Sequence, residues 1–204
     1  MKKYKLKILS SIVAIALVAT VFYNIPRTEY LMSDRITLAS DVDKLNDVSD
    51  LVVLATVVND KENVIVKSGI DGHEMFGYTV TTLNIKTIIS GELNDESVKI
   101  TEEYYESSDL TGKIIWTEGT YKPAKKGRDY IFYLKKYPDD SSYSGMYFPV
   151  DLEHGKYAII KNVKDKTIDG LSASELDISK KSDLKEYKKW YKYVMKENEK
   201  YLED

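Results

Sequence analysis

The sequence predicts a mainly β fold, an antiparallel barrel or sandwich with one helix before it and one after it. Short runs rich in β-branched and aromatic residues follow one another between residues 51 and 162, and turn-forming residues separate them. Strands and helices do not alternate along this region, which argues against a parallel sheet. Helical spacing of apolar residues occurs only on the two sides of the β region.

An apolar run at residues 8–23 follows four lysines that stand within the first seven residues. A basic segment followed by an apolar one is typical of an export leader, with the lysine side remaining inside the cell. The run has 16 residues, whereas roughly 20 cross a bilayer. Neither 14–16 nor 17–19 is a good cleavage site, so residues 1–23 are interpreted as a membrane anchor. A cleaved signal peptide is the alternative, and a buried core helix is a third interpretation.

Charge and cysteine content restrict the partners of the exported part. Without the four leader lysines, 26 basic residues stand against 33 acidic ones, a net charge of −7. An acidic surface repels phosphate backbones, so nucleic acid is not expected as a partner. The chain contains no cysteine, which excludes disulfides and a lipid-modified cysteine. A β region of about 130 residues can instead be held together by its own core.

Two segments precede the first strand. Residues 24–38 contain a proline and mixed residue types, which is typical of a stalk. Residues 39–50 predict a short helix with apolar residues on one face, capped by Ser40 or Asp41. The barrel domain is expected to span residues 39–162.

Short strands account for most of the domain. The run at 51–58 is apolar throughout, which predicts a strand buried on both faces. The length of 76–89 predicts a bend or bulge within that strand. Turns are expected at 68–74, 122–128 and 138–145. The expected strands cover residues 51–58, 63–67, 76–89, 98–105, 113–117, 129–137, 146–150 and 156–162.

The end of the chain predicts a linker and then a helix. Residues 163–181 are polar and contain Gly170, which is typical of a linker. In 182–204, Asp183 and Glu186 match a capping box, and apolar residues recur at helical spacing. This amphipathic helix is expected to cover one mouth of the barrel with its lysines in water. The alternative is a basic helix that touches a membrane surface.

Four segments carry a resemblance to known proteins, and together they cover about residues 49–161. They are SDLVVLATV (49–57), YTVTTLNIKTIISGE (78–92), KKGRDYIFYLKK (125–136) and GMYFPVDLEHGKYAII (145–160). They resemble a module of exported and membrane-anchored proteins of Gram-positive bacteria. The strand order is also similar to the OB-type barrel of tissue inhibitors of metalloproteinases and netrin-like domains. The resemblance implies a small antiparallel OB-like barrel after a membrane leader. Those inhibitors bind zinc through an N-terminal cysteine, so their activity is not expected here.

The sequence contains no recognisable catalytic set. His73 and His154 fall in predicted turns without a nucleophile motif, so each is interpreted as a solvated loop histidine. A metal site around His73 would lack a fourth ligand. Glu102 and Glu103 are neighbours on a strand and point to opposite faces, so they are interpreted as solvated surface charges. We therefore expect no catalytic residue, no cofactor and no metal.

Aromatic residues are the remaining functional signal. The chain has 17 tyrosines, and four aromatic residues lie in or beside predicted strands in the middle of the β region. Exposed aromatic side chains suit the recognition of sugars, peptides or proteins. OB barrels bind ligands across their second and third strands and the adjacent loops. The candidate ligand-binding surface therefore consists of Tyr104, Tyr105, Trp116 and Tyr121, unless these residues are ordinary core and surface.

Taken together, these patterns favour a membrane-anchored extracytoplasmic module that binds a protein, peptide or glycan without catalysis. If the leader is cleaved, the module is secreted. An exported hydrolase that uses carboxylates with His73 or His154 is one alternative. An immunity or stress protein that sequesters an extracellular peptide is another.

Overall fold

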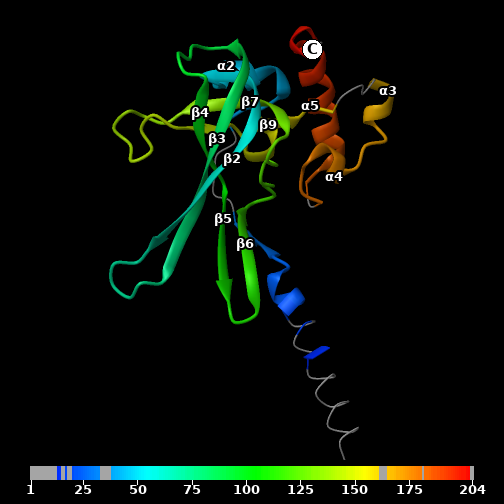
Figure 1. Cartoon of the computed structure of the whole chain (residues 1–204). Coiled ribbons are helices and arrows are strands. Elements are labelled where there is room, and N and C mark those ends of the chain that lie inside the picture. Colours follow the sequence, from blue (N-terminus) through cyan, green and yellow to red (C-terminus); the bar gives the residue numbers. More distant parts are fainter. Residues whose placement is uncertain are drawn as a thin grey trace, which may run out of the picture.

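The computed structural model describes residues 13–14, 17, 20–32, 38–160, 165–180 and 182–202 of the chain. Most of the predicted leader lies outside these residues. In the part of the chain that is described, no helix is long and apolar enough to cross a membrane. The main body is a closed five-stranded β-barrel with a short helix before it and a helix after it (Figure 1).

The barrel confirms the predicted OB-like fold. Its strands follow the order β2-β3-β4-β8-β7, and β7 pairs with β2 to close the ring. The pair β4–β8 is parallel, and the other pairs of the ring are antiparallel. This arrangement is the Greek-key barrel of OB folds. The five strands are β2 (Leu51–Lys67), β3 (Glu74–Ser90), β4 (Ser97–Glu102), β7 (Asp129–Lys136) and β8 (Tyr147–Pro149). Strand β9 (Lys156–Ala158) extends the sheet along β7.

Strand β2 joins the two runs that were predicted as separate strands, and with β3 it forms a long hairpin that extends beyond the barrel (Figure 1). The bulge expected within residues 76–89 is confirmed, since β3 has an extra residue opposite the step from Leu54 to Ala55. A larger irregularity lies on the partner strand. Between Val57 and Lys61, β2 advances four residues while β3 advances only two. Extra residues bend a strand and increase its twist. The hairpin can therefore belong to the barrel at one end and leave it at the other.

A second sheet contains β1 (Arg27–Leu31), β5 (Tyr104–Asp109) and β6 (Gly112–Glu118), in the order β1-β6-β5. The predicted strand 98–105 is two strands, β4 and β5, with Glu103 between them. The stalk predicted at 24–38 is wrong for residues 27–31, which pair in parallel with β6. The segment that precedes the predicted barrel domain therefore contributes an edge strand.

Two apolar layers pack on the two faces of β2 and β7. Leu51, Val53 and Ala55 point into the barrel interior, whereas Val52 and Leu54 point outward. All five side chains are buried. The predicted strand with two buried faces is therefore confirmed, because the C-terminal helix covers the outer layer.

The C-terminal helix α5 (Leu184–Glu197) packs against the outside of the barrel, and the prediction that it covers a barrel mouth is wrong. Trp190 and Val194 are buried in the layer that contains Val52 and Leu54. Two tyrosine hydroxyls of α5 donate to carbonyl oxygens of β9 over 2.7 and 2.8 Å. Asp183 caps the helix as predicted, since its side chain accepts from backbone amides of the first turn.

The segment before α5 is packed rather than a free linker. It contains the short helices α3 (Asp165–Ile168) and α4 (Ala173–Leu176). Three apolar side chains anchor it in the same layer as α5: Ile168, Leu176 and Ile178. The short helix predicted at 39–50 consists of η1 (Val42–Lys44) and α2 (Leu45–Val48), and Asp41 caps it. Single turns η2 (Leu152–Gly155) and η3 (Glu199–Tyr201) complete the described elements.

Candidate functional site

An open groove of about 310 Å³ lies where the β5–β6 hairpin, the start of β3 and the loop between β7 and β8 meet. Tyr78 also lines an adjoining groove of about 620 Å³, which runs along β4. The smaller groove is the more aromatic of the two. We call it the aromatic groove, after the aromatic side chains that line it: Phe76, Tyr78, Tyr104, Tyr105, Trp116, Tyr137 and Tyr143.

One wall of the aromatic groove comes from the β5–β6 hairpin. Antiparallel pairing places Tyr105 opposite Trp116, and their rings stack at 6.3 Å between centroids. The Trp116 indole N–H donates to Ser107 Oγ over 2.9 Å, which fixes the indole plane. A Cβ atom at Gly77 would lie 2.4 Å from Tyr105 Cγ, so only glycine lets this ring rest against β3. The wall is therefore formed before any ligand arrives.

The opposite wall comes from the loop between β7 and β8. Tyr137 and Tyr143 pack at 4.7 Å between ring centroids, and Tyr143 meets Tyr78 edge-on at 5.1 Å. Thr101 Oγ1 and the Tyr137 hydroxyl share a hydrogen bond of 2.8 Å. The Tyr137 amide donates to the carbonyl of Met146 over 3.1 Å. These contacts tie the loop to β3 and β4, so this wall is also held in place.

The charges along the two grooves are mixed. Glu103 and Glu118 line the aromatic groove. Burial raises the pKa of Tyr78 and of Tyr105, so both phenols are neutral hydrogen-bonding groups near pH 7. The adjoining groove has two carboxylates and two ammonium groups, from Glu62, Asp95, Lys99 and Lys136. Rigid aromatic faces beside carboxylates are suited to binding a polar ligand that also has an apolar face.

The four residues predicted as a ligand-binding surface divide into two groups. Tyr105 and Trp116 lie side by side in the aromatic groove, where Trp116 is half-buried and Tyr105 is only 6% exposed. Tyr104 lines the groove but is only 4% exposed, and its hydroxyl accepts from Lys61 Nζ over 3.1 Å. Tyr121 is 2% exposed and lies outside the groove lining. The predicted surface is therefore wrong for Tyr121, which is a core residue.

Sequence reasoning missed four aromatic side chains of the groove. Phe76 and Tyr78 open β3, directly after the turn that joins the first two barrel strands. Tyr137 and Tyr143 belong to the loop that joins the last two barrel strands. Loops at these two positions flank the ligand face of OB barrels. Aligning the predicted strands with an OB barrel would have identified them.

A buried carboxylate on β4 forms the second polar region of the molecule. Glu102 is 0% exposed, so its interpretation as a solvated surface charge is wrong. Its Oε2 accepts from Lys61 Nζ over 3.0 Å and from Thr81 Oγ1 over 2.5 Å. Its Oε1 accepts from the Tyr121 hydroxyl over 2.8 Å and from the Ala124 amide over 2.7 Å. Four donors satisfy this carboxylate, which ties the loop after β6 to the barrel.

A buried lysine lies beside this carboxylate. Lys156 on β9 is 1% exposed, and burial lowers its pKa to about 8. Its ammonium lies 4.8 Å from the ring centroid of Tyr121 and 5.6 Å from that of Tyr130. It also donates to the carbonyl of Lys122. Ring faces and a carbonyl thus replace the water that this cation has lost.

A second buried carboxylate completes the region. Asp177 follows α4 and is 1% exposed. Its Oδ1 pairs with Lys122 at 3.2 Å and Lys125 at 2.8 Å, and its Oδ2 accepts from the Tyr130 hydroxyl. Glu102, Lys156 and Asp177 with these partners form what we call the buried polar cluster. It lines neither groove, and its contacts join β4, β9 and α4 to the loop between β6 and β7.

The two histidines have different surroundings. His73 is at the turn of the β2–β3 hairpin, with a side chain 64% exposed, and pairs with Asp71. His154 in η2 is half-buried and stacks on Trp190 at 4.3 Å and on Tyr187 at 5.9 Å. The interpretation of His154 as a solvated loop residue is therefore wrong. Among the residues that the structure describes, no group of three acidic or histidine side chains could hold a metal.

No family model matches the chain, and no curated protein matches it. Any inference about function therefore comes from the geometry of these two regions. The aromatic groove is open to the surroundings, and the buried polar cluster is closed.

Proposed function

We propose that this chain is a non-catalytic binding module that is anchored in the cell membrane by its leader and binds its ligand in the aromatic groove outside the cell. The position of the groove carries this proposal. It lies on β3 and β4, the second and third strands of the barrel, beside the loop that joins the fourth and fifth. OB barrels bind their ligands on this face.

The ligand that fits best is an extended peptide or glycan chain. The aromatic groove continues past Tyr78 into the adjoining groove, which gives a track longer than one small molecule needs. Sugar and peptide groups offer C–H faces for the partly exposed rings of Trp116 and Tyr78 and donors for Glu103 and Glu118. These carboxylates, together with the net charge of −7 on the part of the chain after residue 23, disfavour polyanions.

The apolar run supports the anchoring part of the proposal. Its last residues, 20–23, are helical. Described side chains of the run are exposed rather than packed on the barrel: Val13 51%, Leu17 63%, Val21 60% and Phe22 69%. Such a helix gains most by entering lipid. Intact-mass measurement of the native protein, together with cell fractionation, tests this part. A full-length mass in the membrane fraction is expected, and a soluble intracellular chain would contradict the proposal.

Arrays of glycans and of peptides, probed with the full chain in detergent, test the binding part. We expect retention of one ligand class and no turnover of the ligand. Trp116→Ala removes one ring face of the groove and should weaken binding by tenfold or more, on the order of the effect of an aromatic hot spot. Tyr201→Ala is the matched control, because Tyr201 lies on η3, outside the groove. Equal binding by both variants, or hydrolysis of the ligand, would refute the proposal.

A further inference from the structure

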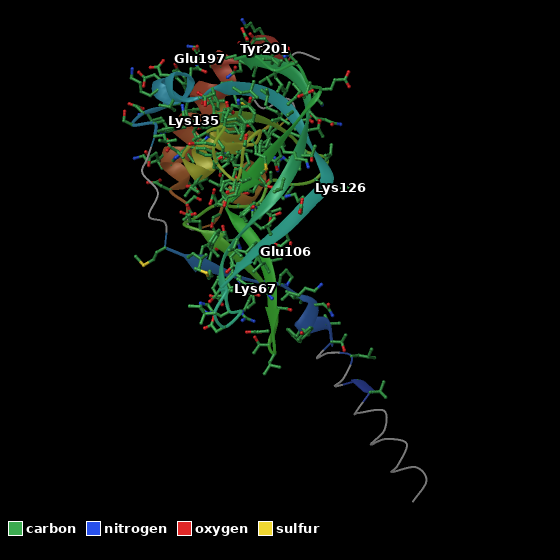
Figure 2. All side chains as sticks on the ribbon, turned by 90° about the vertical axis from the view of Figure 1, so that its left-hand side faces the viewer. Lys67, Glu106, Lys126, Lys135, Glu197 and Tyr201 are labelled. Carbon is green, nitrogen blue, oxygen red and sulfur yellow. The ribbon has the colours of Figure 1, made fainter. Side chains whose placement is uncertain are left out.

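Two hairpins extend from the barrel toward the end of the molecule where the leader lies, and both views show this (Figures 1 and 2). Each has one aliphatic residue at its turn. Ile70 at the turn of β2–β3 is 98% exposed, and Leu110 at the turn of β5–β6 is 99% exposed. A single exposed apolar residue is ordinary, but here two fully exposed ones stand at the tips of two hairpins that extend toward the same end of the molecule.

The β5–β6 turn lies against the end of the apolar run. Tyr23 is the last residue of that run, and its hydroxyl donates to the carbonyl of Asp109 over 3.3 Å. Gly112 has a φ of +132°, and a Cβ atom there would lie 2.8 Å from the Tyr23 carbonyl oxygen. Because a side chain at position 112 would clash with this carbonyl, glycine permits the close approach. Leu110 is therefore next to the point where the leader meets the domain.

The charges beside the tips are of both signs, and the carboxylate next to each tip is paired, Asp71 with His73 and Asp109 with Arg27. The Arg27 guanidinium pairs with Asp109 at 2.8 Å and holds the pKa of that carboxyl well below its usual range. Lys67 and Lys113 are exposed, and each is three residues from an aliphatic tip. Lysines at this spacing can reach anionic headgroups while the tip inserts more deeply.

We propose that both hairpins rest on the outer leaflet of the membrane, with Ile70 and Leu110 inserted into its interfacial region. This inference rests on the proposed anchoring by the leader and adds two contacts that fix the orientation of the barrel. The aromatic groove, whose walls include residues of the same two hairpins, then opens close to the lipid surface. An extended ligand would be bound there as it lies along the membrane.

The absence of cysteine from the chain allows a clean test with single-cysteine probes. Full chains with Ile70→Cys, Leu110→Cys or Glu197→Cys are labelled with a fluorophore and reconstituted in phosphatidylglycerol–phosphatidylethanolamine vesicles. Glu197 is exposed and lies at the end of the molecule opposite the tips (Figure 2). Nitroxides attached to the lipid headgroups should quench the labels at positions 70 and 110 several-fold more than the label at 197. Equal quenching at all three positions would overturn the inference.

A second set of variants separates insertion of the tip from insertion of the label. Ser108 is exposed and polar, and it is two residues from Leu110. With the label at Ser108→Cys, replacing Ile70 and Leu110 by serine should reduce the quenching several-fold, whereas unchanged quenching would contradict insertion of the tips. Flotation of the vesicles separates the two proposals. A chain that floats without quenching at the tips refutes only the hairpin contacts, and a chain that does not float refutes the anchor as well.

Discussion

The aromatic groove and the buried polar cluster both contain residue types that proteins use for binding and catalysis, and they differ in what those residues already contact. In the buried polar cluster, both oxygens of Glu102 have two donors each, and Lys156 is surrounded by two rings and a carbonyl. In the aromatic groove, edges and hydroxyls are held by neighbours while ring faces line open space. The saturated groups of the cluster stabilise the fold, whereas the partly exposed rings of the groove are those that the proposed ligand would contact.

The largest expected effect is on the buried polar cluster. Replacing Glu102 with alanine leaves Lys61 and Tyr121 without their shared partner in the interior. We expect the free energy of unfolding to fall by about 3–5 kcal/mol, the usual cost of breaking a buried ion pair. Urea unfolding of the chain measures this. The exposed carboxylate Glu92 provides the control, since Glu92→Ala should change stability by less than about 0.5 kcal/mol. A similar effect of both variants would show that the cluster does not stabilise the fold.

The fold was largely predictable because its signals are local. The apolar run at 51–58 lies within one barrel strand, and the strand predicted at 129–137 matches another to within one residue. The helix cap at Asp183 is where the sequence places it. Errors occur where long-range pairing decides the structure. Residues 27–31 are a strand only because β6 offers a free edge, and the polar segment 163–181 is packed because three of its apolar residues reach the layer under α5.

The candidate site was only half predictable, for a related reason. Tyr105 and Trp116 form one wall through the pairing of adjacent strands, and a sequence shows such pairing. The other wall requires the 137–146 loop to fold back onto β3, and no local pattern reveals that. Glu102 was misread because its partners come from residues 61, 81, 121 and 124, which only the closed barrel brings together.

Lys156 allows the cluster to be tested through its pH dependence. Its pKa is about 8 in the folded chain against an ordinary value of 10.5. Between these values the unfolded chain binds more protons, so stability rises with pH across this window. Between pH 7 and pH 9.5 the wild type should gain about 2 kcal/mol of unfolding free energy relative to Lys156→Met. Urea unfolding at both pH values measures this difference. Parallel pH profiles would mean that the lysine keeps its ordinary affinity for protons.

His154 gives a smaller effect of the same sign at lower pH. Burial lowers its pKa from the ordinary 6.5, and this outweighs the carboxylates of Glu153 and Glu186, which raise it. The unfolded chain therefore binds the proton first as the pH falls through 6.5, and the folded state loses stability. His154→Phe keeps a ring against Trp190 without a charge. Thermal unfolding from pH 7 to pH 5 should show a shallower loss for this variant. All carboxylates titrate in both proteins, so the difference between their pH profiles of stability comes from the histidine alone. Identical pH profiles would mean that burial does not lower the pKa of His154.

The smallest effect on stability is expected for a substitution in the aromatic groove. This substitution tests most directly whether the groove and the buried polar cluster have different roles. Phe76 lines the groove and is 45% exposed, so its ring contributes little to the core. Phe76→Ser should change the free energy of unfolding by no more than about 0.5 kcal/mol. The same variant should weaken retention on the glycan or peptide array, because it removes an apolar face from the track. A variant that lost stability but kept its ligand would reverse the roles assigned to the two regions, since the groove would then hold the fold and binding would occur elsewhere.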